Sequence, residues 1–329
     1  AAHSTSVAAM RVAVTGSIAT DHLMTFGGKF ADSLVVEQLD KISVSFLADD
    51  LQIRRGGIAA NIAFGMANLG QSPVLVGAVG EDFADYRSWL ERHGVDCASI
   101  LVSGKAHTAR FVCTTDQDHA QIATFYPGAM SEARAIELRP VADRVGGLDL
   151  VLIGPNDPVA MQRHTDECRT RGIPFAADPS QQLAWLDGRG IRDLIEGAAY
   201  LFTNEYEAHM IAQKAGWDER DLADAVGVQV TTKGKDGAVI RRKGEEPIEV
   251  HVIPGVRPVD PTGVGDAFRG GFLTGLASGL DHERCAQLGS TLAAYVIETV
   301  GTQEYTLATH QLVERVRSAY GEAAATDIA

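Results

Sequence analysis

The sequence predicts an α/β fold in which an open, mostly parallel sheet is flanked by helices and carries a small inserted β-sheet. Short apolar runs recur about 25 residues apart, the length of one βα unit, with helical stretches between them. Two regions break this rhythm with alternating polar and apolar residues. The 329 residues, 45% hydrophobic and 22% charged, are enough for a substantial core. We expect one domain over residues 11–329.

The predicted buried strands are apolar runs that end in glycine or polar residues. They are Val12–Gly16, Asp149–Gly154, Pro174–Asp178, Tyr200–Asn204 and Val228–Lys233. Polar or turn-forming residues close the last four, as Pro155–Asp157 do after the second run. The carboxyl ends of the strands are the ligand-facing edge of an open α/β sheet, although a single polar loop is ordinary. Four such loops together favour a site along that edge.

The alternating segments are Ile42–Leu47, Thr108–Thr114 and Gln121–Tyr126. A period of two is typical of strands with one exposed face, and the turn-prone Asp116–Asp118 predicts a hairpin between the last two. We expect residues of about 18–55 and 105–128 to form a lid. Its apolar face would cover an active site, a second subunit or both. Exposed strand edges favour a homodimer through the lid sheets, because they are a liability in an isolated chain.

The composition excludes several classes of function. The net charge is −14 and no cluster of Lys and Arg is present, which argues against a nucleic-acid partner. No apolar run approaches the roughly 18 residues of a membrane span, so no membrane partner is expected. Four widely spaced cysteines without a C-x-x-C pair are typical of reduced thiols in a cytoplasmic protein.

Neither end of the chain is expected to add a folded element. Ala1–Ala9 precede Met10 and lack the basic and apolar regions of a secretion signal, so residues 1–10 are expected to be a leftover leader. At the other end, Ala323–Ala325 are expected to belong to a frayed tail.

The strongest local signal is the run Gly263-Val264-Gly265-Asp266. Its alternate glycines permit a tight turn with convergent N–H groups, and the apolar residues that follow predict a helix, so this is a candidate anion site. Asp266, in the first turn, would act as a general base toward a hydroxyl that attacks phosphorus. The alternative is an aspartate that only complements the helix dipole. A dinucleotide fingerprint is excluded because Phe268 occupies the third glycine position, and no Walker A loop is present.

The second signal is the pair Gly56-Gly57, which opens a helix that is expected to end at a Gly70 C-cap. Glycine there lets a ligand approach the backbone. Asn61, one turn into the helix, can donate and accept hydrogen bonds toward a hydroxyl-rich molecule. Asp21, after the first strand, can accept hydrogen bonds from two neighbouring hydroxyls.

These two motifs resemble the signatures of the ribokinase-like (PfkB) family of carbohydrate and nucleoside kinases. Gly56–Gly80 and Asp260–Gly271 match the two signatures, and the resemblance runs from Arg11 to about Thr306. Val264 stands where the family usually has a smaller residue, at a position that contributes only its N–H. The resemblance implies a ribokinase-like fold and a kinase that uses ATP with Mg²⁺.

The resemblance also implies roles for single residues. Asp266 is the catalytic base, and the amides of Gly263, Val264 and Gly265 form an anion hole for the transferred γ-phosphoryl group. Asp260 matches a position near a monovalent-cation site, which makes K⁺ a possible cofactor. The residues that match ATP-binding positions are Asn204, Glu207, Thr232, Lys233, Gly234, Lys235, Asp236 and Gly237. Of these, Glu207 is expected to hold Mg²⁺ through water.

The lid and the first loops indicate the substrate. Ala19 and Ile58 stand where ribokinases of the family carry Asn and Lys, which removes polar groups from a pocket for a free sugar. Phe111 and Phe125, on neighbouring lid strands, can sandwich a purine. The expected substrate-binding residues are Ser17, Asp21, Ser45, Gly57, Asn61, Phe111, Gln121, Phe125, Gln181 and Gln182.

The overall pattern resembles the adenosine kinases of the family. It implies ATP-dependent phosphorylation of the adenosine 5′-hydroxyl to give AMP and ADP, a step of purine salvage, with adenosine and ATP as partners. Three alternatives stay open. The aromatic pair can pack against a partner lid, the enzyme can be a ribokinase or another sugar kinase, or the chain can be a non-catalytic regulator that binds a nucleoside. The presence of Asp266 and both glycines disfavours the regulator.

Overall fold

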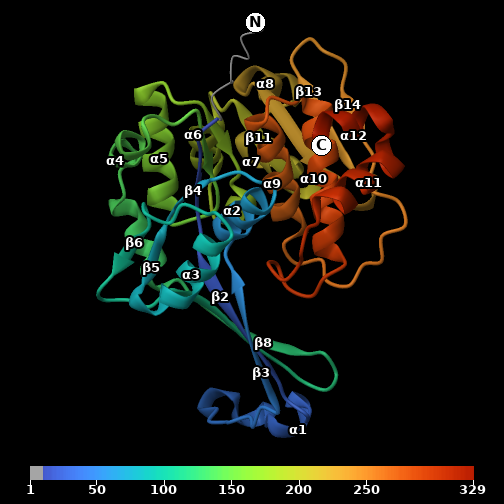
Figure 1. The fold of residues 1–329 in the computed structure, drawn as a ribbon. Helices are drawn as coiled ribbons and strands as arrows, with labels where there is room; N and C mark the ends of the chain where they lie inside the picture. Colours follow the sequence, from blue (N-terminus) through green and yellow to red (C-terminus); the bar gives the residue numbers. More distant parts are fainter. Residues whose placement is uncertain (1–9) are drawn as a thin grey trace, which may run out of the picture.

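The computed structural model describes residues 10–329 (Figure 1), so the predicted leader, apart from Met10, lies outside the described residues. The body is an eight-stranded sheet in the order β14-β13-β12-β11-β10-β9-β1-β4. Its strands are β1 (Val12–Thr15), β4 (Val74–Val76), β9 (Leu150–Ile153), β10 (Phe175–Ala177), β11 (Tyr200–Asn204), β12 (Val228–Thr232), β13 (Ala238–Arg242) and β14 (Ile248–Val250). All neighbours pair in parallel except β12–β13 and β13–β14. The predicted open, mostly parallel sheet is confirmed.

Helices cover both faces of this sheet. They are α1 (Phe30–Ser33), α2 (Ile58–Asn68), α3 (Ala84–Arg92), α4 (Leu138–Val145), α5 (Pro158–Arg171), α6 (Gly188–Ile195), α7 (Glu205–Ala215), α8 (Glu219–Ala225), α9 (Val264–Ala277), α10 (His282–Ile297), α11 (Thr309–Tyr320) and α12 (Glu322–Ile328), of which α1 alone lies outside the body. Alternate residues of each strand enter different cores. In β1, Val12 and Val14 pack with α2, α9 and α10, whereas Ala13 packs with α4 to α7. This alternation buries β1 on both faces, as its unbroken apolar run predicts.

A second, small sheet projects from one end of the body (Figure 1). Its strands are β2 (Ala19–Thr25), β3 (Asp50–Gly56), β7 (Ala109–Thr115) and β8 (Gln121–Tyr126), in the order β3-β2-β7-β8. The predicted hairpin is confirmed, with β7 and β8 antiparallel. The whole of β8 is exposed, rather than one face of it. A further two-stranded sheet joins β5 (Ala78–Gly80) to β6 (Leu101–Ser103).

The predicted strand Ile42–Leu47 is wrong. Residues 42–48 have no regular structure and follow a short 3₁₀ helix, Val36–Lys41, at the far end of the small sheet. The segment is instead held by an aromatic cluster, in which the ring of Phe46 lies 5.1 Å from that of Phe26 and 4.8 Å from that of Phe30. The ring of Phe46 therefore holds the segment, and no apolar strand face does, because Ile42 and Val44, which alternate with Phe46, are 55% and 39% exposed.

The C-terminal segment is also not a frayed tail. Residues Glu322–Ile328 form α12, and the side chains of Ala324 and Ala325 are fully buried. They pack against Leu288, Leu312 and Val316. Alanine is the strongest helix former, and its small side chain allows this close approach.

The four cysteines are free and buried, which agrees with the predicted reduced thiols. Among the described residues, no helix is long and apolar enough to cross a membrane.

Candidate active site

The N-terminus of α9 is the centre of the candidate site. Its N-cap, Gly263, has a φ of 78°, and a Cβ there would lie 2.7 Å from the Cγ2 atom of Thr302, so only glycine fits. The amide of Ala267 donates to the Gly263 carbonyl at 2.9 Å, and that of Val264 to the Pro261 carbonyl at 3.4 Å. Amides in the first turn of a helix lack intrahelical partners and carry the positive end of its dipole. The predicted residues therefore form a glycine-capped helix N-terminus, the kind of turn that can bind an anion, although the Val264 amide is already used by the Pro261 carbonyl.

Asp266 lies in this first turn. Its Oδ2 atom accepts a hydrogen bond from Asn61 Nδ2 at 2.9 Å. Burial raises the pKa of Asp266 to about 7, against the Asn61 hydrogen bond and the charge of Arg269, which lower it, while Asp178 and Glu207 raise it further. A carboxyl group with a pKa near 7 suits a general base, because it is ionised in a large fraction of molecules at neutral pH and still holds a proton strongly.

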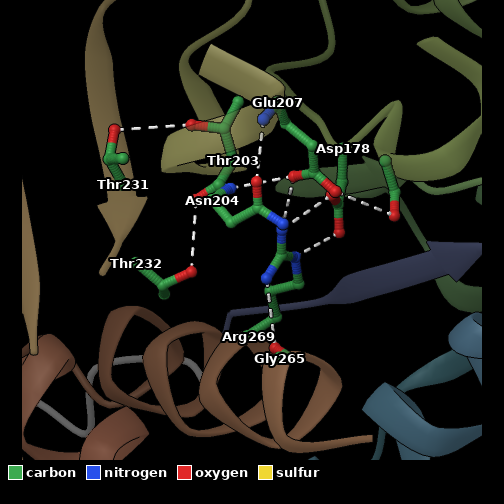
Figure 2. A network of polar contacts seen from close by, with 9 residues as sticks. Asp178, Thr203, Asn204, Glu207, Thr231, Thr232, Gly265 and Arg269 are labelled. Atoms are coloured by element: carbon green, nitrogen blue, oxygen red, sulfur yellow. Dashed lines mark hydrogen bonds and ion pairs between the residues drawn. The ribbon is translucent and has the colours of Figure 1, made fainter. Parts of the chain in front are cut away.

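Arg269, Asp178 and Glu207 form a largely buried ion network (Figure 2), and their charges act on Asp266. The Arg269 guanidinium donates to both carboxylate oxygens of Asp178, with a distance of 3.0 Å from Nη2 to Oδ1. Its Nη1 atom also donates to the Gly265 carbonyl at 3.2 Å. The two side chains are 7% and 1% exposed. Burial lowers the pKa of Arg269, but the charges of Asp178, Glu207 and Asp266 outweigh burial and raise it, so the guanidinium stays charged.

Arg269 and Asp178 were not among the predicted site residues. A signal for both was present in the sequence. Arg269 is the one charged residue of the otherwise apolar and glycine-rich stretch from 267 to 273, and Asp178 closes a predicted buried strand. Charged groups in such places are rarely buried without a partner.

The ends of β11 and β12 meet the same network. Asn204 and Glu207 form a capping box at α7, in which each side chain accepts from the other residue's amide at 2.8 Å. The Glu207 Oε2 atom lies 4.0 Å from Nη2 of Arg269. Thr232 Oγ1 donates to the Thr203 carbonyl at 3.4 Å, a contact drawn in Figure 2. The carboxyl edge of the sheet therefore gathers the polar strand ends, as expected.

The loop after β12 contains the remaining predicted ATP-binding residues. The Lys233 amide donates to the Gly237 carbonyl at 2.7 Å and closes the loop around the 3₁₀ turn Gly234–Asp236. Lys235 and Asp236 are exposed on this turn.

The other motif lies at the start of α2. Gly57, with a φ of 92°, packs so closely on the loop after β1 that a Cβ would meet the Ile18 Cα at 2.6 Å. Ser17 Oγ accepts from the Ile58 amide at 3.0 Å, so Ser17 holds α2 against β1. The predicted helix is confirmed, although its C-cap is Leu69, with Gly70 one residue beyond.

Asn61 lies differently from the sequence-based expectation. Its amide, 7% exposed, donates to Asp266 and accepts from the side chains of Thr302 and Gln303, both at 2.9 Å. The side chain therefore contacts the candidate base rather than standing free for a sugar hydroxyl.

One face of the small sheet carries a row of predicted substrate-binding residues. The strand register places Asp21 beside Phe111, and Phe111 beside Phe125. Burial raises the pKa of Asp21, against the charge of the neighbouring Arg54, which lowers it. Residues at paired positions project from the same face of a sheet. The structure thus aligns a carboxylate with two aromatic rings.

The other predicted residues are more scattered. Gln121 is exposed at the start of β8, Ser45 is exposed in the segment that joins β2 to β3, and Gln181 is exposed after β10. The Gln182 Nε2 atom donates to the Asn156 carbonyl at 3.0 Å. The structure does not bring Ser45 to Asp266, because its segment lies at the far end of the small sheet.

Asp260, the predicted cation-site residue, holds two backbone segments together. Its Oδ1 atom accepts from the Thr262 amide at 2.9 Å, and its Oδ2 atom accepts from the Gly301 amide at 3.0 Å. Burial raises its pKa, but these donors outweigh burial and lower it. Within residues 10–329, no group of three or more His, Cys, Asp or Glu side chains is arranged to hold a metal ion.

Comparison with known proteins gives the same family as these motifs. Residues 21–309 match the pfkB family of carbohydrate kinases. A nucleoside kinase of Methanothermobacter thermautotrophicus is 33% identical over 269 residues, which cover 81% of this chain and 85% of that enzyme.

Solved structures agree. The nucleoside kinase of Burkholderia thailandensis in complex with inosine aligns with a TM-score of 0.82 at 33% identity, over 94% of this chain and 99% of that one. The same enzyme has been solved in complex with ADP-inosine, with a TM-score of 0.80 at 34% identity, over 94% of this chain and 96% of that one. The nucleoside kinase of Methanocaldococcus jannaschii aligns with a TM-score of 0.80 at 25% identity, over 94% and 98% of the two chains. The chain has the ribokinase-like fold and belongs to the pfkB family of carbohydrate kinases.

Proposed function

We propose that this kinase is a nucleoside kinase that transfers the γ-phosphoryl group of ATP to the 5′-hydroxyl of adenosine, giving AMP and ADP for purine salvage. The observation that carries the proposal is Asp266, a carboxyl group with a raised pKa in the anion-binding turn of α9. The Burkholderia relative, which binds inosine, supports a purine nucleoside as the acceptor.

In the proposed mechanism, the small sheet acts as a lid over the nucleoside. Asp21 accepts hydrogen bonds from the ribose hydroxyls, and Phe111 and Phe125 stack on the base. Asp266 removes the 5′-hydroxyl proton as that oxygen attacks phosphorus, and the amides of the turn at Gly263–Gly265 stabilise the charge on the transferred group. Positioning and charge neutralisation supply most of the acceleration.

Mg²⁺ would neutralise charge on the ATP phosphates. It usually keeps several waters and needs only one or two carboxylates from the protein, so the single carboxylate of Glu207, 14% exposed beside the anion-binding turn, fits this role. We assign no step to K⁺, because both oxygens of Asp260 already accept backbone amides.

The acceptor is tested by steady-state kinetics with ATP and Mg²⁺. We expect kcat/KM for adenosine to exceed that for ribose by about tenfold or more, since stacking of a base is worth about 1–3 kcal/mol. A higher kcat/KM for ribose would identify a sugar kinase instead, and a higher kcat/KM for inosine would reassign the base.

The same assay tests the base. We expect Asp266→Asn to retain adenosine binding in a calorimetric titration and to lose kcat by about 10²–10⁴-fold. A kcat near that of the wild type would remove Asp266 from the mechanism, and no turnover by the wild-type chain with any nucleoside or sugar would favour a regulator.

We also propose that the chain forms a homodimer through its lids. The face of the lid opposite Phe111 carries Ile53, Leu51 and Ile122, which are 62%, 53% and 46% exposed. The register places them in alternation with the substrate-facing row. A second copy of this chain presents the same apolar face, so two lids can cover each other.

A further inference from the structure

Asp266 accepts a hydrogen bond from Asn61, and the orientation of the Asn61 amide is itself fixed by further hydrogen bonds. The Oδ1 atom of Asn61 accepts from Thr302 Oγ1 and from Gln303 Nε2, each at 2.9 Å. A side-chain amide accepts only through its oxygen, so these two donors leave the Nδ2 atom of Asn61 to face Asp266, as observed.

The orientation of the Gln303 side-chain amide is also fixed. Its side chain is 1% exposed, and its Oε1 atom accepts from Trp89 Nε1 at 3.1 Å. An indole nitrogen is a donor only, so the amide nitrogen of Gln303 must point the other way, toward Asn61. Hydrogen bonds thus run from Trp89 through Gln303 and Asn61 to Asp266, each residue donating to the next.

The same residues bind the end of β3, a strand of the lid. Thr302 Oγ1 lies within hydrogen-bonding distance of the Arg55 carbonyl, at 3.0 Å, as well as of Asn61 Oδ1, so the two acceptors share its single proton. Tyr86 donates to the Gly56 carbonyl at 2.8 Å and accepts from Gln303 Nε2 at 2.6 Å. Burial raises the pKa of Tyr86, so its hydroxyl stays protonated and remains a donor.

We propose that Gln303 and Thr302 are positioning residues, which orient the Asn61 amide so that it donates to Asp266 and which connect this orientation to the end of β3. The proposal rests on the proposed function, in which Asp266 is the base. Neither residue makes a recorded hydrogen bond to Asp266, so both act through Asn61.

The consequence is a dependence of the reaction on pH. The groups that face Asp266 are Asn61 from α2, Arg269 from α9 itself, Asp178 after β10 and Glu207 from α7. Loss of the Gln303 donor leaves the last three unchanged, but it leaves Asn61 Oδ1 with only the shared proton of Thr302, so that the Asn61 amide can turn its oxygen toward the carboxylate. Because the Asn61 hydrogen bond lowers the pKa of Asp266, its loss raises that pKa.

The test is the pH profile of kcat/KM, which reports the free enzyme. Gln303→Leu removes the donor, and Thr302→Val removes the second donor with little change of shape. We expect the acid limb for Gln303→Leu to move to higher pH by about one unit, because the Asp266 carboxylate loses a hydrogen bond that favours its charged form. Thr302→Val should move the limb in the same direction, and Thr302→Ser, which keeps the hydroxyl, should leave it in place.

A direct titration of the Asp266 carboxyl by ¹³C NMR in the same variants is independent of turnover. A raised pKa in Gln303→Leu and Thr302→Val supports the positioning role. An unchanged pKa and an unchanged acid limb in variants that remain folded would overturn it. Asp266→Asn is measured in parallel to distinguish failure of the proposed function from failure of this proposal. Normal turnover by Asp266→Asn would reject Asp266 as the base, whereas the ¹³C titration would still test the hydrogen-bond chain.

Discussion

At the scale of single residues, Asp266 lies between two polar networks with opposite characters. On one side, the charges of Arg269, Asp178 and Glu207 act on Asp266. On the other side, the neutral amide of Asn61 donates one hydrogen bond. Burial has the largest effect and raises the pKa of Asp266; Asn61 and Arg269 lower it, whereas Asp178 and Glu207 raise it further. The acid strength of the base is therefore set by position, not by the identity of the residue alone.

Arg269 gives a test at this scale. We expect Arg269→Met to lower the free energy of unfolding by about 3–5 kcal/mol at pH 7, because it leaves the carboxylate of Asp178 buried without its partner. Chemical denaturation in urea measures this loss. Arg241→Met, at an exposed position of β13, is the control and should change the free energy by less than about 0.5 kcal/mol. Equal losses in the two variants would show that the buried ion pair contributes no more than an exposed arginine.

The sequence predicts the residues of the α9 turn well but not their neighbours. Glycine spacing and the start of an apolar stretch are local features, so the positions of Gly263 and Asp266 follow from the chain itself. Asn61 and Gln303 are separated by 242 positions, and only the packed fold shows that they are bonded. The sequence therefore predicts Asn61 as a sugar ligand, because nothing local in the chain indicates that Gln303 is its hydrogen-bond partner.

At the scale of elements, local patterns in the sequence predict some strands and not others. Buried parallel strands such as β11 are continuous apolar runs, and their bounds agree with the prediction. The strand β3 is partly charged, and its weak alternation at Leu51 and Ile53 does not predict a strand, whereas the more regular alternation of residues 42–47 predicts one that the structure lacks. Alternation indicates which side chains share a face only when a neighbouring strand is present to pair with.

The hairpin of β7 and β8 carries a prediction of its own. We expect Phe111→Ala to raise KM for adenosine by about tenfold while changing KM for ribose little, because only the nucleoside has a base to stack on the ring. Val112→Ala is a matched control, since the next residue of the strand points to the opposite face. Equal increases of KM for both substrates in Phe111→Ala would assign the ring to packing.

At the scale of the whole molecule, the small sheet joins the body at the site itself. Three residues separate the end of β1 from the start of β2, and one residue separates the end of β3 from the start of α2. The connections are the loop Gly16–Ile18 and Gly57, which pack closely against each other. In the proposed function, in which the small sheet is a lid over the nucleoside, these two connections are the hinge positions about which it would move.

In the proposed function the two faces of the small sheet have different roles, and the oligomeric state tests the face away from Phe111. We expect the wild-type chain to have twice its 35.0 kDa mass in sedimentation equilibrium, and Ile53→Asp to be monomeric because it places a charge in the apolar lid–lid contact. Val102→Asp, which adds the same charge at a 48% exposed position on β6, should remain dimeric. If the wild-type chain is a monomer, or if Ile53→Asp stays a dimer, this face of the lid is not the contact. Since Ile53 lies on the face away from Phe111, a monomeric Ile53→Asp that keeps its KM for adenosine would show that substrate binding and assembly use opposite faces of one sheet.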